Sequence, residues 1–198
     1  MKIVGVGCGP GLLTEQAIQE ISRASVIYGS QRAIDLAKSR IPHGCTVKTI
    51  DDFKQLDILQ LGKLPDSTVI LSTGDPMLAG LGYLSGTVIP GISSFQLAAA
   101  RLKIPISRIS VVVAHGKGHE KAREDTLEEV KQGKIVFLLA DPKFDVRKLY
   151  ADLSAFPLPL KVALCENLGY PDECILIRDI QSPPSPTEDL YSLVIGVF

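Results

Sequence analysis

The chain has 198 residues, of which 45% are hydrophobic and 22% charged, a composition that supports a buried core and argues against disorder. Its formal net charge of −1 gives no bulk attraction for a nucleic acid. The longest apolar runs, such as 134–140 (KIVFLLA), are too short to cross a membrane, and the chain enters an apolar run at Lys2 without a leader pattern. We therefore expect a cytoplasmic protein that binds neither nucleic acids nor membranes.

In the first half of the chain, short apolar runs alternate with helical patterns. Thr14 is a good N-cap residue and begins a helical pattern over 14–24. Further helices are expected at 30–40, ended by Pro42, and at 52–63. The expected strands are 2–6, 25–28, 47–50, 68–72 and 87–89. Because strands lead into loops and helices, this half predicts a mainly parallel α/β sheet.

After 103–107 (KIPIS) the alternation restarts, but strands now follow one another more often. The expected strands are 109–114, 134–140, 160–164, 173–177 and 191–198, and the expected helices are 119–132 and 144–155. The proline-rich stretch 182–189 (SPPSPTED) fits only a surface connection. A mixed sheet is therefore expected here, and we predict two domains, 1–105 and 106–198.

The cysteines and histidines give little support for a metal site. His115 and His119 are four residues apart, but the glycines between them disfavour the helix that this spacing would need. We expect no metal there. The cysteines show no CxxC spacing and are expected to be free thiols: Cys8, Cys45, Cys165 and Cys174.

Three glycine-bearing loops follow the strands expected at 2–6, 68–72 and 87–89. They read VGVGCGPGLLT (4–14), STGDPMLAGLG (72–82) and PGISSFQLAAARL (90–102). Parallel strands end at one edge of a sheet, so the loops are expected to form one ligand site built largely of main-chain groups. Their acidic residue Asp75, like Ser93 and Ser94, could equally cap a turn or helix.

The first loop does not match the nucleotide-binding fingerprints. The pattern G-x-G-x-x-G fails because its third glycine is replaced by Pro10 when counted from Gly5, and by Leu12 when counted from Gly7. The strand expected at 25–28 also ends without the acidic residue that would bind a ribose, and no Walker-type phosphate loop is present. The loops therefore favour a bulky, partly apolar ligand.

In order and spacing, the three loops resemble those of the tetrapyrrole (corrin/porphyrin) methyltransferase family. The likeness continues through VVVAHGKG (111–118), IVFLLADPK (135–143) and ALCENLGYPDE (163–173). The resemblance implies a two-domain α/β protein, usually a homodimer, that binds S-adenosylmethionine (SAM) in the cleft between its domains. PGISSFQLAAARLKIP (90–105) with ENLGYPDE (166–173) resembles the subgroup that methylates C5 of cobalt-precorrin-7, also called precorrin-6Y, in cobalamin biosynthesis.

The resemblance also implies which residues bind the ligands. The residues implied for SAM are Cys8, Gly74, Asp75, Leu78, Ser93, Ser94, Leu139, Ala140, Ala163 and Leu164. The residues implied for the tetrapyrrole are Gly7, Gly9, Pro10 and Gly11. Some relatives carry a second domain that methylates C15 and removes a carboxyl group, and here that step would need a separate protein.

Methyl transfer from a sulfonium depends mainly on orientation and exclusion of water, so no nucleophile is expected. The candidates for a general base are Asp75, His115 and Glu166, and none is assigned. Cations that could bind the carboxylates of a corrin precursor, or simply be solvated, are Arg101, Arg108, Lys117 and Lys121. Two alternatives remain: the same fold acting on a diphthamide precursor or ribosomal RNA, and a SAM-binding subunit without activity.

Overall fold

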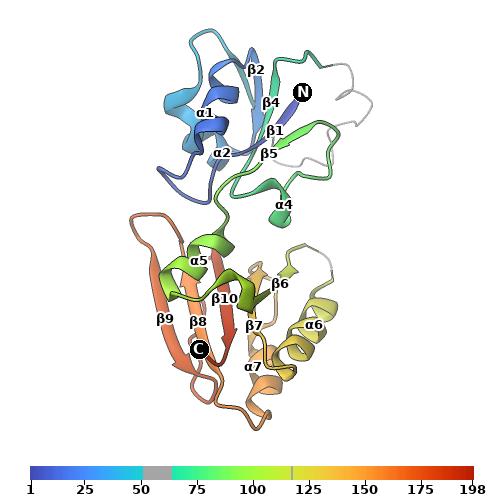
Figure 1. Ribbon diagram of the computed structural model, residues 1–198, viewed down its shortest axis with the longest axis vertical. Helices are drawn as coiled ribbons and strands as arrows, with labels where there is room; N and C mark the ends of the chain where they lie inside the picture. The colour runs from blue at the N-terminus through green and yellow to red at the C-terminus, as the bar shows by residue number, and fades with distance from the viewer. Residues whose placement is uncertain (51–63, 117) are drawn as a thin grey trace. The chain divides into compact units, whose positions relative to one another are not determined.

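The computed structural model describes residues 1–50, 64–116 and 118–198, which form two units, Met1–Ser94 and Phe95–Phe198 (Figure 1). The helix expected at 52–63 lies outside the described residues. The division falls before the boundary expected at 105, because the helix that follows Ser94 packs with the second unit. There the Phe95 ring meets the Phe137 ring edge-on, with 5.5 Å between centroids.

The first unit contains a parallel sheet of five strands in the order β3-β2-β4-β1-β5. The strands are β1 (Lys2–Gly5), β2 (Val26–Gly29), β3 (Thr46–Thr49), β4 (Thr68–Ser72) and β5 (Thr87–Ile89). In the central strand β4 every residue is buried, as its continuous apolar sequence predicts. The parallel sheet expected from the sequence is therefore confirmed.

Helices cover this sheet, and their starts follow from capping residues. They are α1 (Glu15–Ser22), α2 (Gln31–Ala37) with the 3₁₀ turn η1 (Lys38–Arg40), and the short α4 (Pro76–Ala79). Thr14 accepts a hydrogen bond from Ala17 N, as expected, and Ser30 caps α2 in the same way. Apolar residues of α1 and α2, such as Ile21 and Ile34, pack on one face of the sheet. A smaller cluster around Ile3 and Ile70 lies on the other face.

The second unit contains a mixed sheet in the order β6-β7-β10-β8-β9. The strands are β6 (Ile109–Ala114), β7 (Ile135–Ala140), β8 (Lys161–Glu166), β9 (Cys174–Asp179) and β10 (Tyr191–Gly196). Strands β6 and β7 are parallel, whereas β10 is antiparallel to both β7 and β8, and β9 is antiparallel to β8. The mixed sheet predicted for this half is confirmed, and residues 182–189 form neither helix nor strand.

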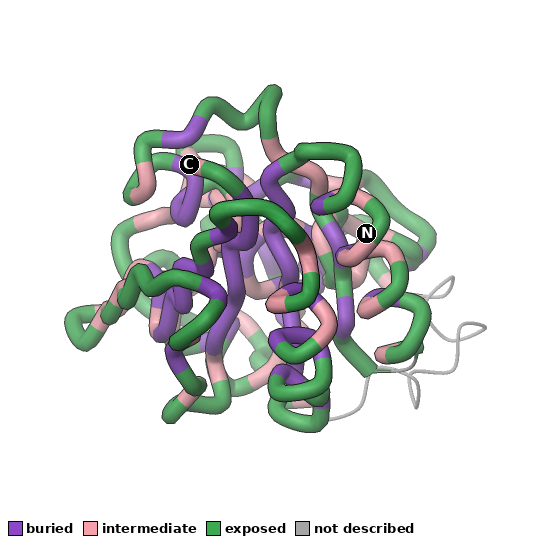
Figure 2. The backbone as a smooth tube through the Cα atoms, turned by 90° about the horizontal axis from the view of Figure 1, so that it is seen from below, coloured by how far each residue is buried: buried purple, intermediate pink, exposed green. Residues whose placement is uncertain are grey.

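Helices α6 (His119–Lys131) and α7 (Val146–Ser154) pack on one face of this sheet, and helix α5 (Ser94–Leu102) contributes Phe95 to the other. A 3₁₀ turn, η3 (Ile106–Arg108), leads into β6. Buried residues follow the strands, whereas most connections are exposed (Figure 2). None of the helices in the described ranges has the length and apolar character needed to cross a membrane.

Candidate functional site

The three glycine loops of the first unit meet at the carboxyl edge of its sheet. Gly7 N donates to Gly74 O at 3.3 Å, and Gly74 N donates to Gly7 O at 2.8 Å, which joins the first loop to the second. Cys8 N donates to Ile92 O at 2.9 Å, which joins the first loop to the third. The loops are thus one main-chain assembly, as the sequence predicts for parallel strands.

Glycine is required where these loops touch, because a side chain would collide with a neighbouring backbone. A Cβ atom on Gly91 would lie 2.2 Å from Gly74 O, and one on Gly5 would lie 2.6 Å from Gly91 N. Gly74 also has φ +68°, a conformation that favours glycine. The spacing of the glycines therefore reflects close packing of three loops.

Asp75 ties the second loop to the third. Its Oδ1 accepts from Met77 N at 2.7 Å and caps α4, while its Oδ2 accepts from Gly91 N at 3.0 Å. The capping role that the sequence left open for Asp75 is confirmed. With both oxygens bonded to the main chain, this carboxylate holds the loops together and is a poor candidate for a general base.

Other residues implied for ligand binding in the first unit differ in accessibility. Pro10 and Gly11 are exposed, Cys8, Leu78 and Ser94 are half-buried, and Gly7, Gly9, Gly74 and Ser93 are buried. A Cβ atom on Gly11 would meet nothing within 4 Å, so the tip of the first loop is open. The sequence analysis did not single out Met77, whose side chain is 68% exposed beside the second loop. This edge therefore offers main-chain groups together with exposed apolar atoms.

The four residues implied in the second unit do not share one face of its sheet. The side chains of Ala140 and Leu164 belong to the core cluster that packs beneath α6 and α7. Leu139 and Ala163 alternate with them and so point to the face that carries Phe137. Only Leu139 and Ala163 can therefore present side chains to a ligand on that face. Ala140 and Leu164 could contact the same ligand only through their main-chain atoms.

Two further polar residues lie on the Leu139 face and were not expected from the sequence. Ser192 pairs with Leu139 on one side and with Cys165 on the other. Its hydroxyl is buried and has no hydrogen-bond partner among the described residues. Burial raises the pKa of Cys165 to about 12, with the Glu173 charge adding to the effect, so this thiol is protonated at neutral pH.

Glu166, the second candidate base, accepts hydrogen bonds that stabilise the fold. Its side chain is buried, and its Oε1 accepts from Thr187 N at 2.6 Å and from Glu188 N at 2.9 Å. Glu166 thereby fastens the proline-rich connection to the end of β8. The third candidate, His115, is exposed just after β6.

Asp141 is a buried carboxylate that the sequence analysis missed. Its Oδ2 accepts from Gly116 N at 2.7 Å and lies 3.1 Å from His119 Nε2, while its Oδ1 accepts from Lys143 N at 2.8 Å. Burial alone would raise the pKa of Asp141, but these backbone N–H groups and His119 together hold it below its ordinary value. Of the two histidines in the 115–119 stretch, His119 therefore contacts a carboxylate, whereas His115 is exposed. The described residues contain no metal-binding group of three or more His, Cys, Asp or Glu, and none of the four cysteines forms a disulfide.

Two of the cations proposed for substrate carboxylates already have partners. Arg101 Nε lies 2.6 Å from Glu173 Oε1, and Lys121 Nζ lies 2.5 Å from Asp125 Oδ1. Arg108 is exposed in η3, and Lys117 lies outside the described residues.

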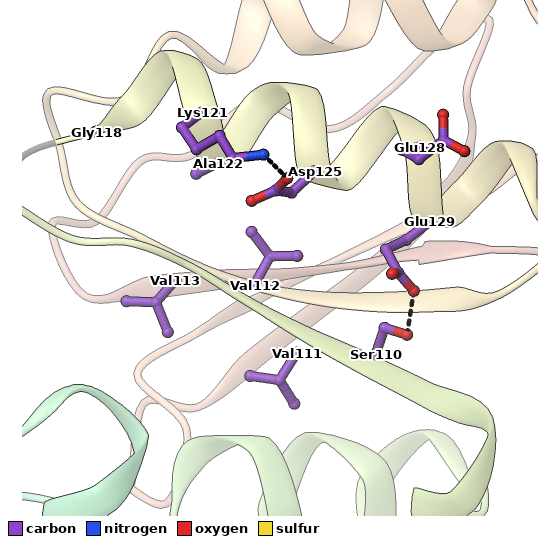
Figure 3. A pocket seen from close by; sticks show the side chains of 10 residues that line it. All are labelled: Ser110, Val111, Val112, Val113, Gly118, Lys121, Ala122, Asp125, Glu128 and Glu129. Carbon is purple, nitrogen blue, oxygen red and sulfur yellow. Dashed lines mark hydrogen bonds and ion pairs between the residues drawn. The ribbon is translucent and has the colours of Figure 1, made fainter.

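A pocket of about 600 Å³ lies between β6 and α6, away from the implied ligand residues. Lys121 pairs with Asp125 one turn further along α6, and Glu129 of α6 faces Ser110 of β6, with 2.5 Å between Glu129 Oε2 and Ser110 Oγ (Figure 3). Because these polar groups are paired with one another, the pocket is a weaker candidate for a ligand site than the glycine edge. By glycine edge we mean the carboxyl edge of the first sheet, where the loops 4–14, 72–82 and 90–102 meet.

The chain is similar to several known proteins. A model of the family described as tetrapyrrole (corrin/porphyrin) methylases matches residues 2–183. A probable cobalt-precorrin-7 C(5)-methyltransferase of Methanocaldococcus jannaschii is 31% identical, over 89% of this chain and 88% of that protein. A precorrin-6Y C(5,15)-methyltransferase (decarboxylating) of Sinorhizobium sp is 27% identical, over 59% of this chain and 30% of that enzyme.

Among solved structures, the chain is similar to a cobalamin-biosynthesis precorrin-6Y methylase from Archaeoglobus fulgidus. The two are 31% identical with a TM-score of 0.75, and the match covers 99% of this chain and 96% of the other.

Proposed function

Because the chain belongs to the tetrapyrrole (corrin/porphyrin) methylases, we propose that it is a SAM-dependent C-methyltransferase that methylates C5 of cobalt-precorrin-7 (precorrin-6Y) in cobalamin biosynthesis. The observation that carries the proposal is the Methanocaldococcus jannaschii relative, which is 31% identical over nearly the full length of both chains. The three glycine loops support the same assignment, since space is open at Gly11 and beside Gly74.

The residues of the glycine edge fit SAM. SAM supplies an activated methyl group when bound, and its adenosine and methionine parts need hydrogen-bonding groups and apolar contacts. The loops offer main-chain groups around Cys8 and Ser94, and the half-buried Leu78 offers apolar surface. A Cβ atom on Gly74 would meet only Ser93 Cα, at 3.8 Å, so space is open beside the second loop. Of the residues that the family resemblance implies for SAM in the second unit, Leu139 and Ala163 have side chains on the face that carries Phe137.

The chain itself contributes orientation and exclusion of water. Holding a methyl donor and a ring carbon in line can lower a barrier by roughly 7–11 kcal/mol. Asp75 and Glu166 already accept main-chain hydrogen bonds, so neither carboxylate is assigned as a base. Gly7, Gly9, Pro10 and Gly11 are assigned to the tetrapyrrole, and the open tip at Gly11 supports that assignment.

The proposal extends to the partners of the enzyme. The Sinorhizobium enzyme, which is named for both C5 and C15, is matched over only 30% of its length. A separate protein that carries out the C15 step is proposed as a partner. Homodimers, expected from the family, can be tested by light scattering. The four free cysteines fit a reducing compartment such as the cytoplasm.

The decisive experiment is incubation of the purified protein with cobalt-precorrin-7 and SAM that carries a ¹³C-labelled methyl group. The expected product is one methyl group heavier, with the label on C5 by nuclear magnetic resonance. An unchanged mass, in an assay where an established C5-methyltransferase converts the same substrate, would reject the proposal. SAM binding by calorimetry without turnover would instead favour a SAM-binding subunit.

A further inference from the structure

Arg32 is a cation at the glycine edge that the sequence analysis did not consider. It lies in the first turn of α2, which starts directly after β2, and β2 is the neighbour of β4 in the sheet. Its Nη2 donates to Thr73 Oγ1 at 3.1 Å. Thr73 in turn precedes Gly74, which pairs with Gly7. The guanidinium is thereby fixed beside the second glycine loop.

No carboxylate of the described residues lies within ion-pair distance of Arg32. The acidic group of the adjacent loop, Asp75, has both oxygens bonded to main-chain N–H groups of Met77 and Gly91. By contrast, Arg101 and Lys121 are each held by an acidic partner. Within the described residues, the charge at Arg32 is therefore not neutralised by an acidic side chain.

The chemistry of the guanidinium indicates what that ligand group is. An arginine carries five N–H donors in a planar fork, and Thr73 takes one of them. The remaining donors match the two oxygens of a carboxylate, which arginine binds more specifically than lysine does. Restraint by Thr73 reduces the side-chain freedom that would be lost when a ligand binds.

We propose that Arg32, positioned by Thr73, binds a carboxylate of the ligand held at the glycine loops. The inference rests on the proposed function, which supplies two sources of carboxylate. A corrin precursor carries several acetate and propionate side chains, whereas SAM carries a single carboxylate. The tetrapyrrole side chain is the assigned partner, and a SAM carboxylate is the other source that the experiment separates.

The test compares Arg32→Met and Arg32→Lys with the wild type. Loss of a charged hydrogen bond predicts an increase in KM for the tetrapyrrole of about 10- to 100-fold in Arg32→Met, with kcat little changed. Arg32→Lys keeps the charge without the fork and is expected to lie between the two. The dissociation constant of SAM, measured by calorimetry without tetrapyrrole, is expected to stay unchanged. An increase in that constant instead would identify the SAM carboxylate as the partner.

Two further variants separate binding from folding. Thr73→Val removes the hydroxyl that holds Arg32, and is expected to raise KM less than Arg32→Met does. The double variant should match Arg32→Met alone, because both changes act through one guanidinium. Arg23→Met is the matched control: Arg23 is exposed at the end of α1, next to the start of β2 and so at the opposite edge of the sheet. It is expected to behave as wild type.

A titration with uroporphyrin, an octacarboxylate tetrapyrrole, followed by its absorbance, tests Arg32 without turnover. Failure of the wild type to methylate would contradict the proposed function, while weaker uroporphyrin binding by Arg32→Met would still support the role of Arg32. If Arg32→Met binds both uroporphyrin and SAM as the wild type does, the inference is overturned.

Discussion

The ends of the strands are held in different ways in the two sheets. In the first unit, loops contact each other through glycine backbones, with Asp75 as the one carboxylate that joins two of them. In the second unit, buried carboxylates fasten the connections: Asp141 binds Gly116 and Lys143, and Glu166 binds Thr187 and Glu188. The first arrangement leaves main-chain groups and space for a ligand. The second arrangement pairs the oxygens of Asp141 and Glu166 with main-chain N–H groups, so these acidic residues act in stability.

Gly91→Ala should break the first arrangement and have the largest effect. The new Cβ would lie 2.2 Å from Gly74 O, and that backbone cannot move without separating the loops. We expect a loss of at least about 3 kcal/mol in the free energy of unfolding, measured by urea titration. Gly44→Ala is the control for backbone conformation without a clash, since Gly44 has a φ of +82° and a Cβ there meets nothing within 4 Å, whereas Gly91 has no positive φ.

Gly44→Ala should cost only about 1–2 kcal/mol, from the left-handed conformation alone. Equal losses of stability in Gly91→Ala and Gly44→Ala would show that close packing of the loops is not what requires glycine at 91.

Asp141→Asn tests the second arrangement. An amide cannot accept all three contacts, and its NH₂ group would face backbone donors, so we expect a loss of about 2 kcal/mol at neutral pH. Asp125→Asn, in an exposed pair with Lys121, should cost less than about 0.5 kcal/mol.

The pH dependence follows from the sign of the shift at Asp141. Because its pKa is lowered in the folded state, its stabilisation is complete above the unfolded value near 3.8 and is lost as pH falls through the folded pKa. The difference between wild type and Asp141→Asn should therefore be constant from pH 7 to about 5 and shrink below about 4. A difference that does not shrink as the pH falls below about 4 would contradict this assignment.

Local signals predicted most of the fold. The continuous apolar run of β4, the Thr14 cap and the order of strands and helices follow from neighbouring residues, and the structure confirms them. The side-chain pairs of the second unit could not be found in this way. His119 and Asp141 are 22 residues apart, and Thr187 and Glu166 are 21 apart, so only the sheet brings them together.

One property of the residues implied for SAM in the second unit follows from the sequence alone. Adjacent residues in a strand point to opposite faces, so Leu139 with Ala140, and Ala163 with Leu164, could not all present side chains to one ligand. By contrast, no sequence pattern indicated that the division between the units follows Ser94 and not residue 105. The helix after Ser94 is assigned to the second unit by contacts such as Phe95 with Phe137, which the pattern of the helix does not contain.

Asp75→Ala should have a smaller effect on stability than Gly91→Ala or Asp141→Asn, and it tests whether the second loop shapes a ligand site as well as the fold. Loss of the cap of α4 costs about 1 kcal/mol. The hydrogen bond from Gly91 N to Asp75 is lost as well. The second and third loops should therefore separate, and SAM affinity should fall. Asp145→Ala removes a comparable cap, from α7, and should cost similar stability without changing SAM affinity. Calorimetry of both variants decides the matter, because unchanged SAM affinity in Asp75→Ala would mean that this part of the glycine edge does not shape the ligand site.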